Sequence, residues 1–84
     1  NTRLPPILRM DIRKVFGANV RVYRLAAGLS QEAVAVRMGV DRAYVSAIER
    51  GLQNVTLLTI WQLAESLNVR PADLLGEPVQ KSRS

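Results

Sequence analysis

Arginine accounts for most of the side chains in this sequence that could do chemistry. Ten of the twelve basic residues are Arg, against seven Asp plus Glu, so the 84-residue chain carries a formal net charge of +5 at pH 7. His and Cys are absent, which excludes imidazole acid–base catalysis, thiol nucleophiles, disulfides and the usual zinc sites. The carboxylates form no recognisable catalytic pair. This composition favours an anionic partner, nucleic acid first, and we expect no enzyme, no metal and no cofactor.

The clearest grouping of candidate residues lies between Ser30 and Gly51. Two short helices, expected at residues 31–38 and 42–50, would be joined by a linker containing Gly39, which is helix-turn-helix spacing. Gly39 permits the positive φ of a tight turn, and Ala35 is small where the helices would cross. Apolar residues at positions 40, 45 and 48 would fill the angle between them. The outward positions of the second helix are then free to face DNA: Arg42, Ala43, Tyr44, Ser46, Ala47 and Arg50.

Three further helices are expected to hold this pair in place, at residues 12–27, 57–67 and 71–75. Apolar residues recur in the two longer segments at steps of three and four, which predicts one inward face each. The first face comprises Ile12, Val15, Phe16, Val20, Tyr23 and Ala27, and the second Leu57, Ile60, Leu63, Ala64 and Leu67. Residues that favour helix ends flank these segments. Ser30, Asp41 and Thr56 are expected as N-caps, and the helices are expected to end at Gly28, Gly39, Gly51, Asn68 and Gly76.

The sequence therefore predicts a single all-α domain over residues 10–77, a compact five-helix bundle. Residues 1–9 are expected to be an extended arm or a cloning remnant, and residues 78–84 a flexible tail. No apolar run approaches the roughly 18–20 residues of a membrane span, so we expect a cytoplasmic protein.

A series of short motifs resembles the phage-repressor-like (XRE) helix-turn-helix family over about residues 12–76. The motifs fall in the order Asn19-Val-Arg-Val-Tyr-Arg24, Gly28-Leu-Ser-Gln-Glu32, Gly39-Val-Asp-Arg42, Tyr44-Val-Ser46, Ile48-Glu-Arg-Gly51, Asn54-Val-Thr-Leu57 and Leu63-Ala64. Within that family the chain is most similar to small stand-alone regulators, including restriction–modification controller proteins, although antitoxins and prophage regulators share the pattern. Val55, Val36 and Leu25 depart from the family's usual residue types.

The resemblance implies DNA contacts of two kinds. Base contacts are expected from Arg42, Ala43, Ser46 and Ala47, since Arg suits the two acceptors of a guanine edge and small side chains can approach a thymine methyl. Backbone contacts are expected from Gln31, Tyr44, Arg50, Gln53 and Asn54, where the family meets phosphates. For Arg42 a simple phosphate contact stays open, and for Ala43 and Ala47 a role as mere helix formers.

Two structural roles are also expected. The resemblance implies a partly buried ion pair between Arg24 and Glu49 that fixes the recognition helix against the core. Leu58, Trp61, Leu74 and Leu75 are candidates for a dimer interface, although an N-terminal arm carrying Ile7 and Leu8 could cover Leu58 and Trp61 instead.

We therefore predict a sequence-specific regulator of transcription that binds double-stranded DNA as a homodimer on an inverted repeat, without a small-molecule effector. Two other functions stay open at this point. One is an antitoxin with a toxin bound to the Leu58–Trp61 surface, and the other is a helical module that binds protein or RNA.

Overall fold

The computed structural model describes residues 10–77, and every regular element in that range is an α-helix. The helices are α1 (Ile12–Ala26), α2 (Gln31–Met38), α3 (Arg42–Glu49), α4 (Leu57–Leu67) and α5 (Pro71–Leu75). The predicted all-α class and the five helices are confirmed, with small differences at the ends of α1 and α3. The arm predicted for residues 1–9 and the tail predicted for 78–84 lie outside the described residues.

Local signals set the helix ends. The Ser30 hydroxyl accepts a hydrogen bond from the Ala33 amide at 2.9 Å, and the Thr56 hydroxyl accepts one from the Thr59 amide at 3.1 Å, which satisfies amide groups that a helix leaves free. Gly39 closes α2 with φ +72°, a conformation that costs glycine little. Asp41 is the N-cap residue of α3, as expected, but its side chain makes no capping hydrogen bond.

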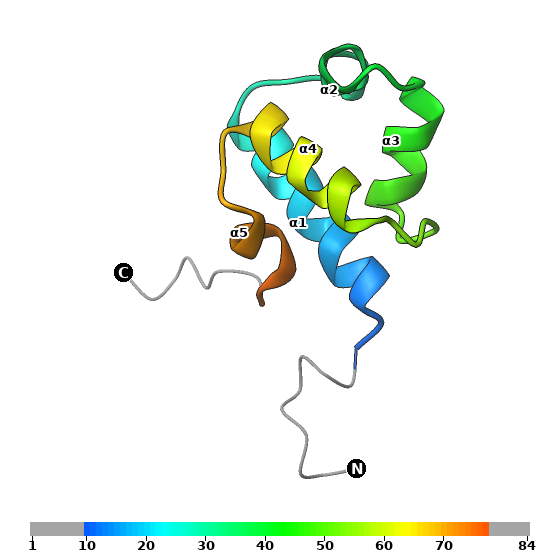
Figure 1. Ribbon diagram of the computed structural model, residues 1–84, viewed down its shortest axis with the longest axis vertical. Helices are drawn as coiled ribbons and strands as arrows, with labels where there is room; N and C mark the ends of the chain where they lie inside the picture. Colours follow the sequence, from blue (N-terminus) through cyan, green and yellow to red (C-terminus); the bar gives the residue numbers. More distant parts are fainter. Residues whose placement is uncertain (1–9, 78–84) are drawn as a thin grey trace, which may run out of the picture.

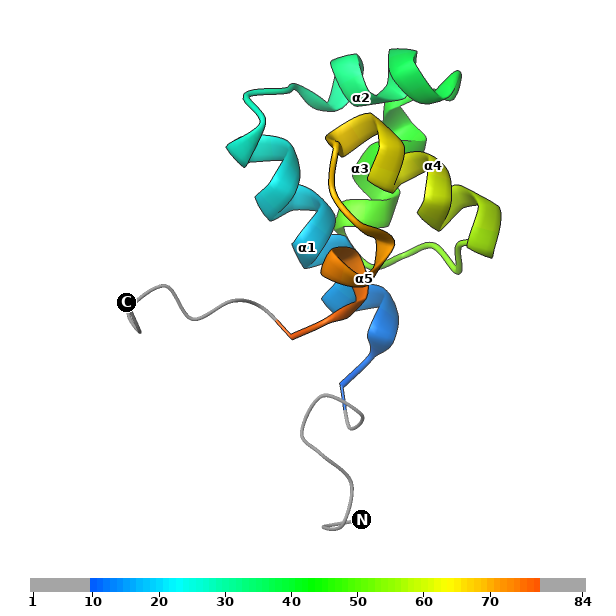
Figure 2. The same cartoon turned by 60° about the vertical axis from the view of Figure 1, so that its left-hand side comes forward.

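The five helices enclose one core. Figures 1 and 2 show α2 and α3 together toward one end of the molecule and α5 beside α1 toward the other. Helix α1 packs against α3, α4 and α5, while α2 packs against α3 and α4. The buried apolar side chains come from all five helices: Phe16, Val20, Val34, Ala35, Val45, Ile48, Leu63, Ala64, Leu67 and Leu74.

Helices α1 and α3 approach each other unusually closely at Gly17. A methyl group built at Gly17 would overlap the carbonyl oxygen of Ile48 and lie 2.8 Å from that of Glu49. Only a residue without Cβ lets the α1 backbone pass at this distance. The C-terminal end of α3 is thereby held directly on α1.

Several burial assignments made from the periodicity are wrong. Leu74 is fully buried although we expected it on a dimer surface, because α5 turns this side chain toward α1 and α4. Leu57 is 85% exposed and Ile12 50% exposed although both were expected inside, and each is the first residue of its helix. Ala27 is also exposed, at the residue that ends α1.

Among residues 10–77, no helix is both long and apolar enough to cross a membrane.

Candidate nucleic-acid interface

The N-terminal ends of α2 and α3 meet at one exposed edge of the molecule. Arg42, the first residue of α3, donates from Nη1 to the Oε1 atom of Gln31, the first residue of α2, at 2.9 Å. Both backbones begin a helix here, so the edge also carries unpaired amide groups and the positive ends of two helix dipoles. Such an edge attracts an anion such as a phosphate.

The outward side of α3 continues from this edge. Arg42 and Ala43 are exposed, whereas Tyr44, Ser46 and Ala47 are half-buried. Val45 and Ile48, on the opposite side, are fully buried in the core. The four residues expected to contact bases therefore lie on one helix whose inward face is anchored, while Tyr44, which was expected on the outward face, packs partly against the core.

A buried ion pair fixes the other end of α3. Arg24 donates from Nε to Oε2 of Glu49 at 2.6 Å and from Nη2 to Oε1 at 3.1 Å, and its Nη1 reaches the Leu29 carbonyl at 2.9 Å. The two side chains are 7% and 3% exposed. This is the bidentate Arg–carboxylate contact that the family resemblance implies, and it ties α1 to α3. Arg21 lies near the same carboxylate, with Nη1 4.0 Å from Oε1.

Glu49 makes one contact that the sequence did not indicate. Its Oε1 atom also accepts a hydrogen bond from Nε2 of Gln31 at 3.1 Å. The resemblance implies that Gln31 meets a phosphate and braces the recognition helix, and here its side chain braces that helix by joining Glu49 to Arg42 within the protein. No sequence signal could have revealed this link, because Gln31 and Glu49 are 18 residues apart and meet only through helix packing.

The residues that follow α3 form a separate part of the candidate interface. Arg50 is exposed and its Nε donates to the Ser46 carbonyl at 3.3 Å. Gln53 and Asn54 instead lie toward α1 and α5, where they line a depression of about 100 Å³ together with Ile12, Phe16 and Leu75, among others. The nine predicted DNA-contacting residues thus fall into two groups, one on α2 and α3 and one after α3.

Two carboxyl groups away from this interface have a lowered pKa. The Arg13 side chain and backbone amide both donate to Asp11 at the start of α1, which lowers the pKa of that carboxyl. The Arg70 backbone amide, followed by its side chain, does the same for the pKa of Asp73 in α5. Both carboxylates hold helix N-termini, so these shifts are structural.

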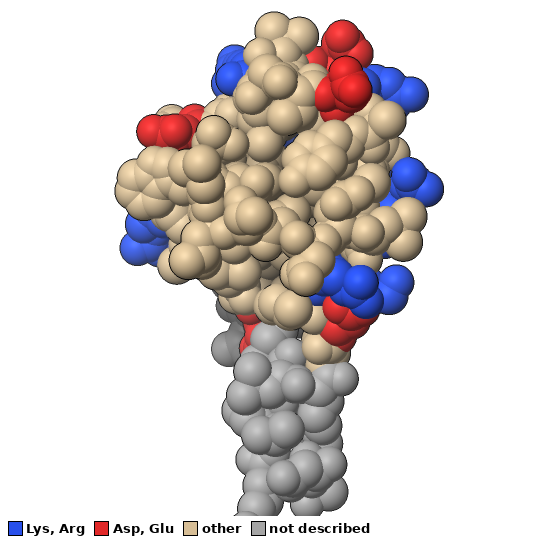
Figure 3. Space-filling model, turned by 45° about the vertical axis from the view of Figure 1, so that its right-hand side comes forward, with Lys and Arg blue, Asp and Glu red and all other residues tan. Residues whose placement is uncertain are grey.

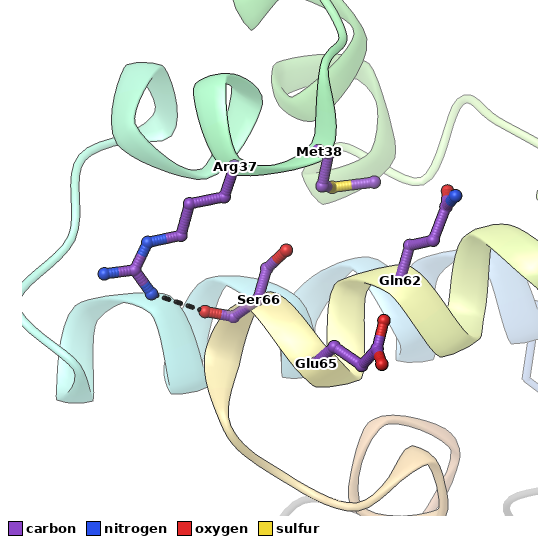
Figure 4. Close-up of a pocket in the computed structure, with 5 residues that line it drawn as sticks. All are labelled: Arg37, Met38, Gln62, Glu65 and Ser66. Carbon is purple, nitrogen blue, oxygen red and sulfur yellow. Dashed lines mark hydrogen bonds between the residues drawn. The ribbon is translucent and has the colours of Figure 1, made fainter.

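A hollow of about 410 Å³ lies between α2 and α4. Figure 4 shows the five side chains that line it, and Nη1 of Arg37 donates to the Ser66 carbonyl at 2.7 Å. The lining mixes one cation, one carboxylate and neutral groups: Arg37, Met38, Gln62, Glu65 and Ser66. The hydrogen bond from Arg37 to Ser66 holds α2 on the last turn of α4.

Within residues 10–77, no group of His, Cys, Asp and Glu side chains could hold a metal ion.

Comparison with known proteins places this geometry in a family. The helix-turn-helix family matches residues 20–74, which includes α2, the turn and α3. This chain belongs to the helix-turn-helix family. Its control-protein relative C.SmaI from Serratia marcescens is 44% identical over 66 residues, covering 79% of each chain.

Solved structures of helix-turn-helix proteins agree in fold. The restriction–modification controller protein C.AhdI from Aeromonas hydrophila has a TM-score of 0.71 and 45% identity, covering 74% of this chain and 94% of that one. The controller protein C.Esp1396I, solved as a tetramer with its natural 35-base-pair operator, has a TM-score of 0.68 and 27% identity, covering 75% and 83% of the two chains. Relatives of this chain are named as an HTH-type transcriptional regulator, from Sinorhizobium fredii, and as controller proteins.

An apolar surface on α4 and α5 is the second exposed feature. Leu57, Leu58 and Trp61 are 85%, 64% and 56% exposed, and Leu75 is 39% exposed. We call these four residues the α4–α5 apolar surface. This surface contains three of the four residues expected at a dimer interface: Leu58, Trp61 and Leu75. The fourth, Leu74, is buried in the core, and Leu57 is exposed in addition. Figure 3, in which the side of the molecule carrying α3 comes forward, shows a broad uncharged region with charged side chains of both signs around its margin.

Proposed function

We propose that this protein is a sequence-specific regulator of transcription that binds double-stranded DNA through α2 and α3. The observation that carries the proposal is Arg42, exposed at the N-terminal end of a recognition helix whose opposite face is locked in the core. In helix-turn-helix proteins the N-terminal residues of this helix contact base edges in the major groove. Arg42, Ala43, Ser46 and Ala47 then read bases, while Gln31, Tyr44, Arg50, Gln53 and Asn54 contact the backbone.

The protein acts as a homodimer through the α4–α5 apolar surface. One domain of this size presents too few side chains to find a single half-site among the competing sites of a genome. A two-fold dimer presents two recognition helices to half-sites about 34–36 Å apart. The operator is then an inverted repeat.

The regulator is a controller protein of a restriction–modification system and has no catalytic activity of its own. It is a bacterial or phage protein that acts in the cytoplasm in association with the nucleoid. The names of its relatives C.SmaI and C.AhdI support this assignment. An adjacent methyltransferase and endonuclease gene would test it.

The DNA-binding proposal is tested by selecting bound duplexes from a random DNA pool. We expect enrichment of one inverted-repeat sequence, and binding that weakens steeply as salt rises, because neutralised phosphates release counterions. Enrichment of no sequence, together with equal binding of single-stranded RNA, would support the helical protein- or RNA-binding module instead. A co-purified toxin seated on Leu58 and Trp61 would support the antitoxin.

A further inference from the structure

Four side chains form a continuous hydrogen-bonded chain from the core to the surface of α3. Arg24 donates to Glu49, Gln31 donates to Glu49 at 3.1 Å, and Arg42 donates to Gln31 at 2.9 Å. The Glu49 side chain is 3% exposed, whereas Arg42 is exposed. Glu49 ends α3 and Arg42 begins it, so Gln31 of α2 connects the two ends of the recognition helix.

The chemistry of the two neighbours determines how the Gln31 amide faces. A carboxylate paired with Arg24 can only accept hydrogen bonds, and a guanidinium can only donate them. Gln31 must therefore turn its NH₂ group to Glu49 and its carbonyl oxygen to Arg42. An amide flipped by 180° would lose both bonds and set donor against donor at Arg42.

We propose that Glu49 is a specificity-determining positioning residue: through the amide of Gln31 it sets the place and direction of the Arg42 guanidinium before DNA is bound. This inference rests on the proposed function, since it concerns how bases are read. Nη1 of Arg42 is held by Gln31, while its Nε and Nη2 make no hydrogen bond within residues 10–77. These two atoms are a donor pair suited to the two acceptors of guanine.

The same chain restricts what position 42 can be. The Gln31 carbonyl oxygen offers an acceptor to position 42 as long as Glu49 holds the amide in this direction. A donor at position 42 is therefore supported, and a carboxylate there would face an acceptor. Replacing Glu49 by Gln removes the restriction, because a neutral amide can donate to or accept from Gln31.

A purely structural role for Glu49 makes a different prediction, and Arg24→Lys is the variant that separates the two. The shorter ammonium side chain keeps the positive charge beside Glu49 but loses the two-bonded fork and the bond to the Leu29 carbonyl. The bond between Glu49 and Gln31 is left in place. If Glu49 only stabilises the fold, Glu49→Gln and Arg24→Lys affect DNA reading alike.

The first test compares binding to a duplex selected by the wild-type protein with binding to a scrambled duplex, at a temperature where circular dichroism shows each variant folded. Glu49→Gln is expected to lower the ratio of the two affinities about tenfold, a loss typical of one disturbed base contact, whereas Arg24→Lys leaves it within about twofold. Gln31→Met, a change at a half-buried position, lowers the ratio as Glu49→Gln does, and decides the matter if Glu49→Gln does not fold. An unchanged ratio in both Glu49→Gln and Gln31→Met would overturn the proposal, as would an equal fall in Glu49→Gln and Arg24→Lys.

The second test needs no DNA and so separates this inference from the proposed function. The side-chain NH₂ signals of Gln31 in a nitrogen–proton NMR spectrum report its bond to Glu49. They should shift in Glu49→Gln, where the neutral amide lets Gln31 face either way, and stay in place in Arg24→Lys. Signals of a solvated glutamine in the wild type would contradict the inference. A wild type with ordered Gln31 signals but no preference among duplexes would leave the hydrogen-bonded chain standing and refute the proposed function.

Discussion

The Arg42 side chain is exposed to solvent, and a hydrogen bond nevertheless holds it in one conformation. Long exposed side chains usually sample many rotamers, and ordering one on binding costs about 0.5–1.5 kcal/mol. In this protein the hydrogen bond from Nη1 of Arg42 to Gln31 already restricts the side chain before any ligand arrives. Part of the side-chain entropy that a base contact by Arg42 would lose is therefore already lost when the protein folds.

Replacing Arg42 with Ala should reduce specificity more than total affinity. A base contact of this kind contributes about 1–3 kcal/mol of discrimination, so the affinities for the selected and scrambled duplexes should converge. Titration of both duplexes measures this. Asn54→Ala is the control, because a backbone contact carries no sequence information and its loss should weaken both duplexes by the same factor. A uniform fall for Arg42→Ala would show that Arg42 holds a phosphate.

At the scale of the elements, the crossing of α1 and α3 determines where the recognition helix lies. Gly17 sets how close the two backbones come, and the Arg24–Glu49 pair sets their alignment one or two turns further along α1. The two devices act on the same end of α3. Its N-terminal end is left free to enter a groove.

Gly17→Ala should destabilise the fold strongly. The added methyl group would overlap backbone oxygen atoms of α3, which cannot rotate away as a side chain could, so we expect a loss of at least about 2 kcal/mol. Chemical denaturation measures the change. Gly76→Ala is the matched control, because its methyl group would lie 3.6 Å from the Ala72 carbonyl oxygen, an ordinary contact. Equal stabilities of the two variants would contradict this account of the crossing.

Arg24→Met should lower the free energy of unfolding by about 3 kcal/mol, because it leaves the buried Glu49 carboxylate without its ionic partner. Denaturant unfolding of the variant tests this. Arg13→Ala removes a pair with Asp11 that is exposed on both sides and should change stability little. If the two variants lose similar amounts, burial does not give the Arg24–Glu49 pair its importance.

At the scale of the whole molecule, large apolar residues remain exposed on several elements, Val36 of α2 and Leu52 after α3 among them. The α4–α5 apolar surface groups Leu57, Leu58, Trp61 and Leu75, and a second pair, Val22 and Leu25, lies on α1. A grouped apolar surface favours association more than scattered residues do. We therefore propose α4 and α5 for the two-fold contact.

Leu58→Glu combined with Trp61→Glu should give a folded monomer that has lost most of its operator affinity, because the second half-site no longer binds at high effective concentration. Sedimentation and circular dichroism measure assembly and folding. Val22→Glu with Leu25→Glu is the matched control, since these residues are 57% and 56% exposed on α1, and this variant should stay dimeric.

Leu74→Glu is unsuitable because it would place a charge in the core. A Leu58→Glu/Trp61→Glu protein that remains dimeric moves the interface elsewhere, and a wild type that is monomeric on DNA refutes the dimer.

The sequence by itself determined the helices, their caps and the helix-turn-helix, because these depend on neighbours a few residues away. Ser30 and Gly39 bound α2 for reasons visible in any short window of the chain. Tertiary structure alone decided which apolar residues at helix ends are buried: Leu74 lies inside and Leu57 outside, since the surroundings of a helix end depend on where other helices lie. It also decided that the Gln31 amide bonds to Glu49, 18 residues away, because a hydrogen bond between separate helices forms only where their packing brings donor and acceptor within about 3 Å.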